Sequence, residues 1–135
     1  MSVLEKMTAW LKNFPQWEGN IRLDGIDPAP GSLGLYPQGI KEVSRREDVL
    51  GNVWIRRRFT LMIYRVTAGE DPAWLLSLQD WVSRQNAAGL TPKMGDVPEN
   101  ETIRAEQGRL SAPNQTGTKR YAVKLTAEYD VKIDN

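Results

Sequence analysis

The sequence YAVKLTAEYDVKI, residues 121–133, decides the fold of this protein. Apolar side chains recur in it with a period of two, at Tyr121, Val123, Leu125, Tyr129, Val131 and Ile133. Small, polar and charged residues fill the positions between them. A regular period of two over this length predicts a long β-strand with one buried face and one wetter face.

A second long strand is expected upstream. Its apolar positions are Val53, Ile55, Phe59, Leu61 and Ile63, and they alternate with Arg56, Arg58, Thr60 and Tyr64. Residues 40–49 read as the strand before it, and Gly51-Asn52 predicts a tight hairpin turn because both residue types tolerate positive φ. Residues 102–110 give a weaker strand, with Pro113-Asn114 and Gly117 marking the turn after it.

Two amphipathic helices flank these strands. In residues 2–14 the apolar side chains follow helical spacing, and Ser2 with Glu5 matches a capping box. The second helix is expected to start with Asp71 as N-cap and Pro72 at its first position, and to end near Gly89. Its apolar stripe consists of Trp74, Leu75, Leu78, Trp81 and Val82.

The segment between the first helix and the second strand is rich in residues that break regular structure. Residues 20–23 have the pattern of a short strand. Residues 28–39 then contain several prolines and glycines, which predict an extended loop with short strand pieces. Such long loops are usually functional or mobile.

Both helices need an apolar surface to cover, and the strands offer one. The expected fold is therefore α+β: two layers, with a mostly antiparallel sheet and the two amphipathic helices on one of its faces. The length of 135 residues suits one domain, and we assign residues 1–135 to it.

The composition argues against most enzyme chemistry. The chain has no histidine and no cysteine, which removes the usual general base, the standard catalytic triads and thiolate metal sites. Neighbouring carboxylates such as Glu47 with Asp48 are more typical of solvated turns than of a metal site. We expect no catalytic residues, no cofactor and no metal, and no apolar run is long enough to span a membrane.

Two features of the second long strand suggest contacts with a partner. Arg56, Arg57 and Arg58 form a basic run that would meet either an anionic protein surface or phosphates. The net charge of only +1 favours a subunit interface over nucleic acid. Trp54 lies on the strand face opposite Val53 and Ile55, where it needs either a partner or a local pocket under the proline-rich and glycine-rich loop.

The order of elements resembles the tail-terminator and tail-completion ("minor capsid") proteins of long-tailed bacteriophages and prophages. The resemblance runs from the first helix to Ile133. The segments that carry it are the capped helix 2–14, GLYP at 34–37, GN at 51–52, RFTL at 58–61, LQDWV at 78–82, GLTP at 89–92, TKRYAV at 118–123 and AEY at 127–129. None of them is a catalytic signature. The segment between Thr67 and Asp71 is shorter than in many members of the family.

The resemblance implies a structural, non-enzymatic virion protein. Such a subunit forms a homo-oligomeric ring, typically a hexamer, that caps the tail tube and faces the head connector. Its partners would be further copies of itself, the tail-tube protein and the head-tail connector proteins. It would be assembled in the host cytoplasm and reside in the tail or neck of the virion.

A ring requires two unlike surfaces that meet head to tail. We expect a basic surface, with Lys119 and Arg120 beside the arginine run, and an acidic one. The candidate interface residues are Trp54, Arg56, Arg57, Arg58, Asp24, Asp27, Glu47 and Asp48. Alternative functions are another neck or head-completion protein, a small nucleic-acid-binding module, and a small carboxylate enzyme.

Overall fold

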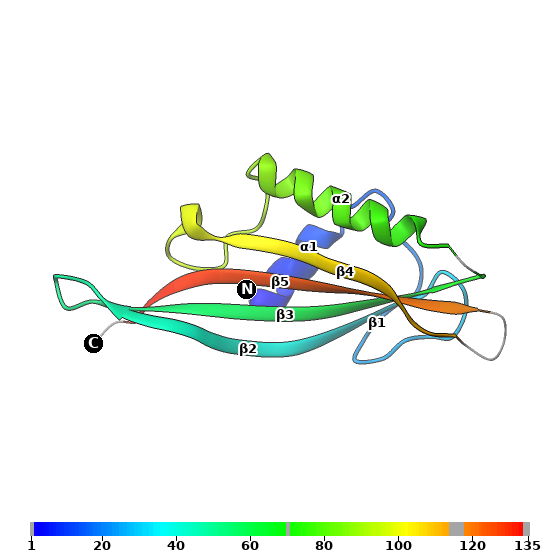
Figure 1. Ribbon diagram of the computed structural model, residues 1–135, viewed down its shortest axis with the longest axis horizontal. Coiled ribbons are helices and arrows are strands. Elements are labelled where there is room, and N and C mark those ends of the chain that lie inside the picture. The colour runs from blue at the N-terminus through cyan, green and yellow to red at the C-terminus, as the bar shows by residue number, and fades with distance from the viewer. Residues whose placement is uncertain (1, 70, 114–117, 134–135) are drawn as a thin grey trace.

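The computed structural model describes residues 2–69, 71–113 and 118–133. Figure 1 shows a long twisted sheet with a helical layer. The elements in chain order are α1 (Val3–Leu11), β1 (Ile21–Leu23), β2 (Leu33–Glu47), β3 (Val53–Thr67), α2 (Ala73–Ala87), the short 3-10 helix η1 (Pro98–Asn100), β4 (Thr102–Pro113) and β5 (Lys119–Ile133).

The strands form one sheet in the order β1-β2-β3-β5-β4. The short β1 runs parallel to β2, and the other neighbouring strands are antiparallel. The two strands expected from their alternation, β3 and β5, lie side by side at the centre and pair without a register shift from Val53↔Ile133 to Thr67↔Lys119. The sheet is therefore mixed, and mostly antiparallel as predicted.

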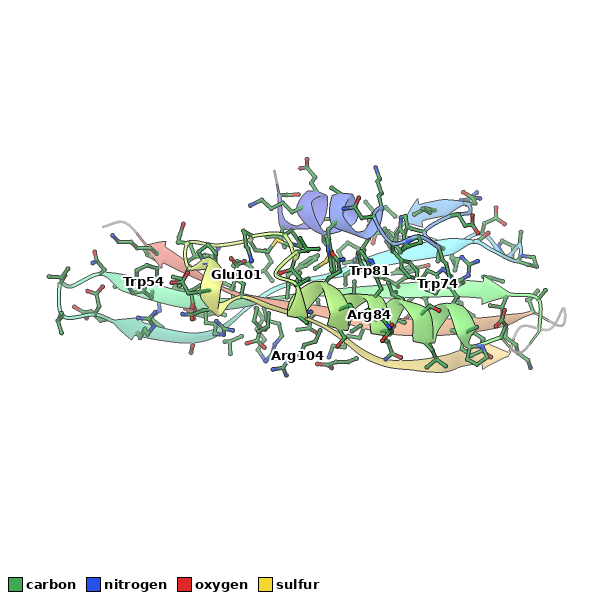
Figure 2. All side chains as sticks on the ribbon, turned by 90° about the horizontal axis from the view of Figure 1, so that it is seen from above. Trp54, Trp74, Trp81, Arg84, Glu101 and Arg104 are labelled. Atoms are coloured by element: carbon green, nitrogen blue, oxygen red, sulfur yellow. The ribbon has the colours of Figure 1, made fainter. Side chains whose placement is uncertain are left out.

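Both helices pack on one face of the sheet, which confirms the predicted α+β fold class. Trp10 of α1 meets Trp81 of α2 with their ring centroids 4.8 Å apart, so the helices are neighbours in one layer (Figure 2). A single core joins this layer to the sheet. The largest fully buried side chains in it are Tyr129, Met7, Leu11, Leu33, Leu61, Ile63, Leu78, Leu125, Val82 and Val123.

The helix ends follow local chemistry. The capping box of α1 is present: the Ser2 side chain accepts from the N–H of Glu5, and Glu5 accepts from the N–H of Ser2. The helix α2 begins one residue later than predicted. Pro72 occupies its N-cap, while the Asp71 carboxylate still accepts from the N–H of Ala73. Gly89 follows the helix with φ +69°, as expected of a left-handed C-terminal residue.

The prediction of a loop up to residue 39 is wrong, because β2 begins at Leu33 and passes through Pro37. Only Leu33–Leu35 of its outer edge is covered, by β1, so no partner strand requires an N–H from the proline. The register then shifts between Pro37 and Gly39, and Gly39 takes φ +95° in this bulge. Pro37 and Gly39 thus introduce a bulge into an edge strand and do not prevent the strand from forming.

The hairpin after β2 is also wider than predicted. It spans Asp48 to Asn52, and among the described residues of this loop only Gly51 has positive φ, at +84°. The weaker predicted strand extends to Pro113 as β4. The rest of the turn predicted after it, including Asn114 and Gly117, lies outside the described residues.

Truncating Leu78 tests the packing of α2 on the sheet. Its side chain is 0% exposed, and we expect Leu78→Ala to lower the free energy of unfolding by about 2–5 kcal/mol. The matched control is Leu76→Ala on the same helix, where the side chain is 57% exposed and little change is expected. Chemical denaturation of both variants measures the difference, and equal losses would contradict this packing.

Candidate functional site

In the part of the chain that the structure describes, no helix lies over one face of the sheet. Positions that alternate with the core residues of β3 and β5 point to this face, which we call the open face. It carries mainly charged and polar side chains, among them Arg56, Arg58, Thr126, Glu128 and Asp130. An uncovered sheet face is the natural place to look for a partner site, so its charges decide what it can bind.

The arginines of the open face are already paired within the chain. Arg56 Nε lies 3.1 Å from Glu128 Oε1, and Arg56 Nη1 lies 3.3 Å from Asp130 Oδ2. Arg56 Nη2 also donates to the carbonyl oxygen of Asn100 at 3.2 Å. Arg58 Nη2 lies 3.0 Å from Glu128 Oε2. These cross-strand pairs neutralise much of the basic run that the sequence suggested as a partner surface.

The bridging carboxylate of this network stays ionised. Burial raises the pKa of Glu128, but hydrogen bonds from Arg58 and Arg56 outweigh burial, and its pKa is lowered. Asp130 is buried beside Arg56. The network therefore holds the surfaces of β3 and β5 together on the side that no helix covers.

Arg57 points to the opposite face, as the alternation predicts. Its register partners are Glu42 on β2 and Tyr129 on β5. The side chain is half-buried, and no ion pair or hydrogen bond holds it among the described residues. Burial raises the pKa of the Tyr129 hydroxyl, and the nearby Arg57 charge partly offsets this. Arg57 is thus separate from the network of Arg56 and Arg58.

The acidic candidates do not form one surface. The backbone of Asp24 donates to the carbonyl oxygen of Leu35, which places Asp24 beside the beginning of β2. Asp27 lies in the same loop, where it pairs with Arg22 at 3.5 Å. Glu47 and Asp48 lie at the other end of β2. These four residues therefore belong to two distant parts of the sheet.

The additional basic residues are equally far from the arginine run. Lys119 pairs with Thr67, and Arg120 pairs with Val66. Val66 lies ten positions along β3 from Arg56, and Thr67 lies one position further. At about 3.3 Å per residue this separation is roughly 30 Å. The expectation that Lys119 and Arg120 would join the arginine run on one surface is therefore wrong.

Trp54 and Asp48 organise the loop between β2 and β3, which we call the hairpin tip (residues 48–52). Asp48 accepts hydrogen bonds from the backbone of Leu50 and Asn52, from the Asn52 amide, and from Trp54 Nε1 at 3.1 Å. The guanidinium of Arg46 lies 5.3 Å from the Trp54 ring centroid. Trp54 is therefore covered by its own hairpin, and not by the proline-rich and glycine-rich loop.

The hairpin tip exposes two neighbouring apolar side chains. Val49 is 102% exposed and Leu50 is 83% exposed. Figure 1 shows the tip projecting past the helical layer at one end of the molecule. Two adjacent aliphatic side chains form a contiguous exposed apolar surface, and contiguous apolar patches are a feature of protein contact sites.

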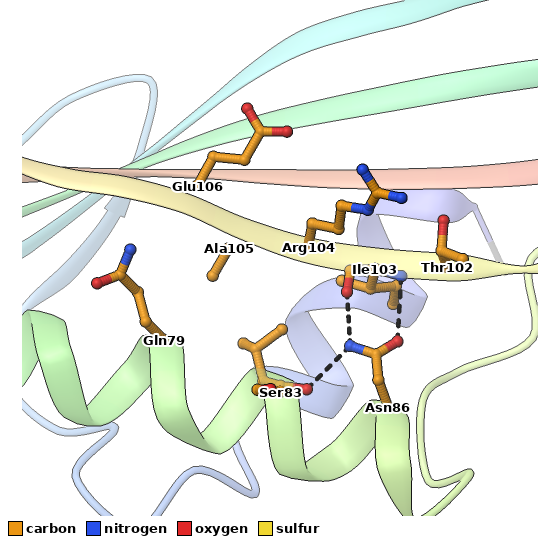
Figure 3. Close-up of a pocket in the computed structure, with 9 residues that line it drawn as sticks. Gln79, Ser83, Asn86, Thr102, Ile103, Arg104, Ala105 and Glu106 are labelled. Atoms are coloured by element: carbon orange, nitrogen blue, oxygen red, sulfur yellow. Dashed lines mark hydrogen bonds between the residues drawn. The ribbon is translucent and has the colours of Figure 1, made fainter.

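A groove of about 470 Å³ runs between α2 and the edge strand β4 (Figure 3). The residues that line it are Gln79, Val82, Ser83, Asn86, Thr102, Ile103, Arg104, Ala105 and Glu106. Ala105 projects toward the helix, whereas Arg104 and Glu106 project to the other side of β4. Sequence reasoning missed this groove, because it depends on which strand lies at the edge beneath α2.

Asn86 occupies the outward backbone groups of Ile103 on the free edge of β4, beside the groove. Its side-chain amide donates to the carbonyl oxygen of Ile103, and its side-chain oxygen accepts from the N–H of Ile103 at 3.3 Å. In an antiparallel ladder such outward groups recur at every second residue. The N–H and C=O of Ala105 therefore also face the groove.

Within the described parts of the chain, no three or more carboxylates are grouped so that they could hold a metal ion. No helix in these parts is long and apolar enough to cross a membrane.

The bonds of Asp48 predict a specific acid sensitivity. Led by the hydrogen bond from Trp54, they lower the pKa of Asp48 from 3.8 to about 2. A depressed pKa adds stability that is complete above the unfolded value and disappears as pH falls through the folded value. We expect Asp48→Asn to remove this part of the pH dependence between 3.8 and about 2, measured by denaturation against wild type. Superimposable pH profiles would contradict the assignment.

The two hydrogen bonds between the Asn86 side chain and the Ile103 backbone, which we call the clamp, also give a measurable prediction. Asn86→Ala should speed hydrogen exchange of the Ile103 amide and cost about 1–3 kcal/mol, because both outward groups lose their partner. Gln79→Ala is the control, since it removes another polar side chain from the same groove wall. Unchanged exchange in Asn86→Ala would argue against the clamp.

The comparisons with known proteins do not place the chain in a family. No protein-family model matches it, and no curated protein matches it either. Three surfaces remain as evidence of function: the open face, whose arginines form ion pairs within the chain, the projecting hairpin tip, and the groove beside the edge strand β4.

Proposed function

We propose that this protein is a structural subunit of a bacteriophage or prophage particle. Copies of it form a ring that caps the end of the tail tube and joins the tail to the head connector. The observation that carries the proposal is the projecting hairpin tip with Val49 and Leu50 in solvent. The order of elements, which resembles that of tail-terminator and tail-completion subunits, gives the particle context.

The exposed apolar side chains favour an assembly role. Besides Val49 and Leu50, the strand β2 exposes Ile40 and Val43, which are 53% and 40% exposed. These four residues lie on β2 or at the hairpin tip that follows it. Apolar groups in water cost free energy that association recovers, so this part of the molecule suits contact with another protein.

The ion pairs of the open face weaken the nucleic-acid alternative. Binding to phosphates releases counterions when free cationic side chains neutralise them. Arg56 and Arg58 already contact Glu128 and Asp130, so phosphates would have to compete with these carboxylates. A neck or head-completion role uses the same kind of surfaces and differs only in the partner.

Self-association tests the proposal. The purified protein should show ring-sized particles at high concentration by light scattering and native mass spectrometry, with hexamers as the expected species. Added to tails that lack their terminal ring, it should bind the tube end in electron micrographs. Binding to the isolated connector but not to tails would favour the neck role. A protein that stays monomeric and binds neither structure would overturn the proposal.

A further inference from the structure

We infer that the hairpin tip of one copy docks into the groove between α2 and β4 of the next copy. This inference rests on the proposed self-assembly and names the two surfaces that meet. The contact is heterologous, because the tip and the groove are different parts of the chain. Such contacts propagate head to tail and close into a ring when the rotation between copies allows it.

The tip has the properties of an inserted element. Val49 and Leu50 are the most exposed large hydrophobic residues that the structure describes. The four hydrogen bonds to Asp48 fix the loop before any partner arrives. A loop that is already ordered loses little conformational entropy on binding, which favours docking.

The groove has the properties of a receptor for such an element. The buried side chains of Val82 and Ile103 form its apolar floor, Ala105 adds a partly exposed methyl group, and its volume of about 470 Å³ is in the range of ligand pockets. The small side chain of Ala105 leaves space against the helix (Figure 3). The outward N–H and C=O of Ala105 can bond to the backbone of the inserted loop, whereas those of Ile103 are occupied by Asn86.

One exposed charge at the tip and one beside the groove have opposite sign. Glu47 is exposed where β2 enters the tip, and the neighbouring Arg46 lies with its guanidinium over the Trp54 ring. Arg104 and Glu106 both line the groove and project to the other side of β4; Glu106 lies 4.0 Å from Lys124, whereas Arg104 has no ion pair or hydrogen bond among the described side chains. Opposite charges at the rim set register and encounter rate more than affinity.

A tip cannot reach the groove of its own chain. Ala105 in the groove is level with Leu61 through their common partner Leu125. The strand β3 begins at Val53, eight residues from Leu61, which is roughly 25 Å at about 3.3 Å per residue, and the tip lies beyond Val53. The hairpin and β4 are also separated by β5 in the sheet. The complementary surfaces can therefore meet only between copies.

Direct pairing of the free edge of β2 with β4 of another copy is the less favourable contact. The β2 edge contains two register shifts, between Pro37 and Gly39 and between Glu42 and Ser44. Bulges and charged side chains on an edge strand oppose pairing with a further strand. The tip lies beyond both irregularities, so docking through it avoids them.

Disulfide trapping tests the contact cleanly, because the chain contains no cysteine. Leu50→Cys and Ala105→Cys are prepared as separate full-length variants, mixed, and mildly oxidised. We expect covalent dimers in the mixture at about tenfold or more over either variant alone, since a bond requires the Cβ atoms to approach to about 4 Å. Leu23→Cys replaces Ala105→Cys in the control mixture, because Leu23 is exposed at the opposite edge.

A second measurement separates the interface from the function. Val49→Asp with Leu50→Asp should weaken self-association by about tenfold or more, while Leu23→Asp leaves it near wild type. If wild type forms rings or binds tails but Leu50→Cys links to itself, to Leu23→Cys or to nothing, this interface is wrong and the proposed function stands. If wild type neither self-associates nor binds tails, both are wrong.

Discussion

The central strands β3 and β5 turn their apolar side chains to the same face along their whole paired length, because their antiparallel register is uninterrupted. That face has to be covered, and α1 and α2 both pack on it around one core. Among the described residues no third layer covers the other face. The open face therefore satisfies its charges within the sheet.

The arginine network is the direct consequence. Arg56 and Arg58 are adjacent along one face of β3, and Glu128 and Asp130 are adjacent along the same face of β5. Cross-strand pairs of opposite charge stabilise a sheet, and removing one partner of a half-buried pair leaves the other charge poorly solvated. The basic run thus contributes to cohesion of the central strands, and the surfaces left for partners are the edges and the ends.

The sequence predicts those features that depend on local pattern. The capping box at Ser2, the apolar stripe of α2 and the alternation of β3 and β5 all follow from near neighbours in the chain. The strand around Pro37 was missed because the propensity of single residues ignores whether a strand has a neighbour on both sides. The ion pairs join residues seventy or more positions apart, so their existence depends on strand order. The clamp of Asn86 on Ile103 and the groove likewise require the edge position of β4, which no local pattern contains.

The hairpin tip is stiff enough to act as a docking element because of what lies next to it. An isolated two-stranded hairpin is only marginally stable in water. Here β5 pairs with β3 as far as Val53↔Ile133, so a third strand supports the β2–β3 hairpin up to its loop. Asp48 then fixes the loop from inside, and Trp54 beneath it is bonded to Asp48 and lies against Arg46. Val49 and Leu50 are thus exposed on a loop that is already ordered, and a partner molecule can bury them without reordering the chain.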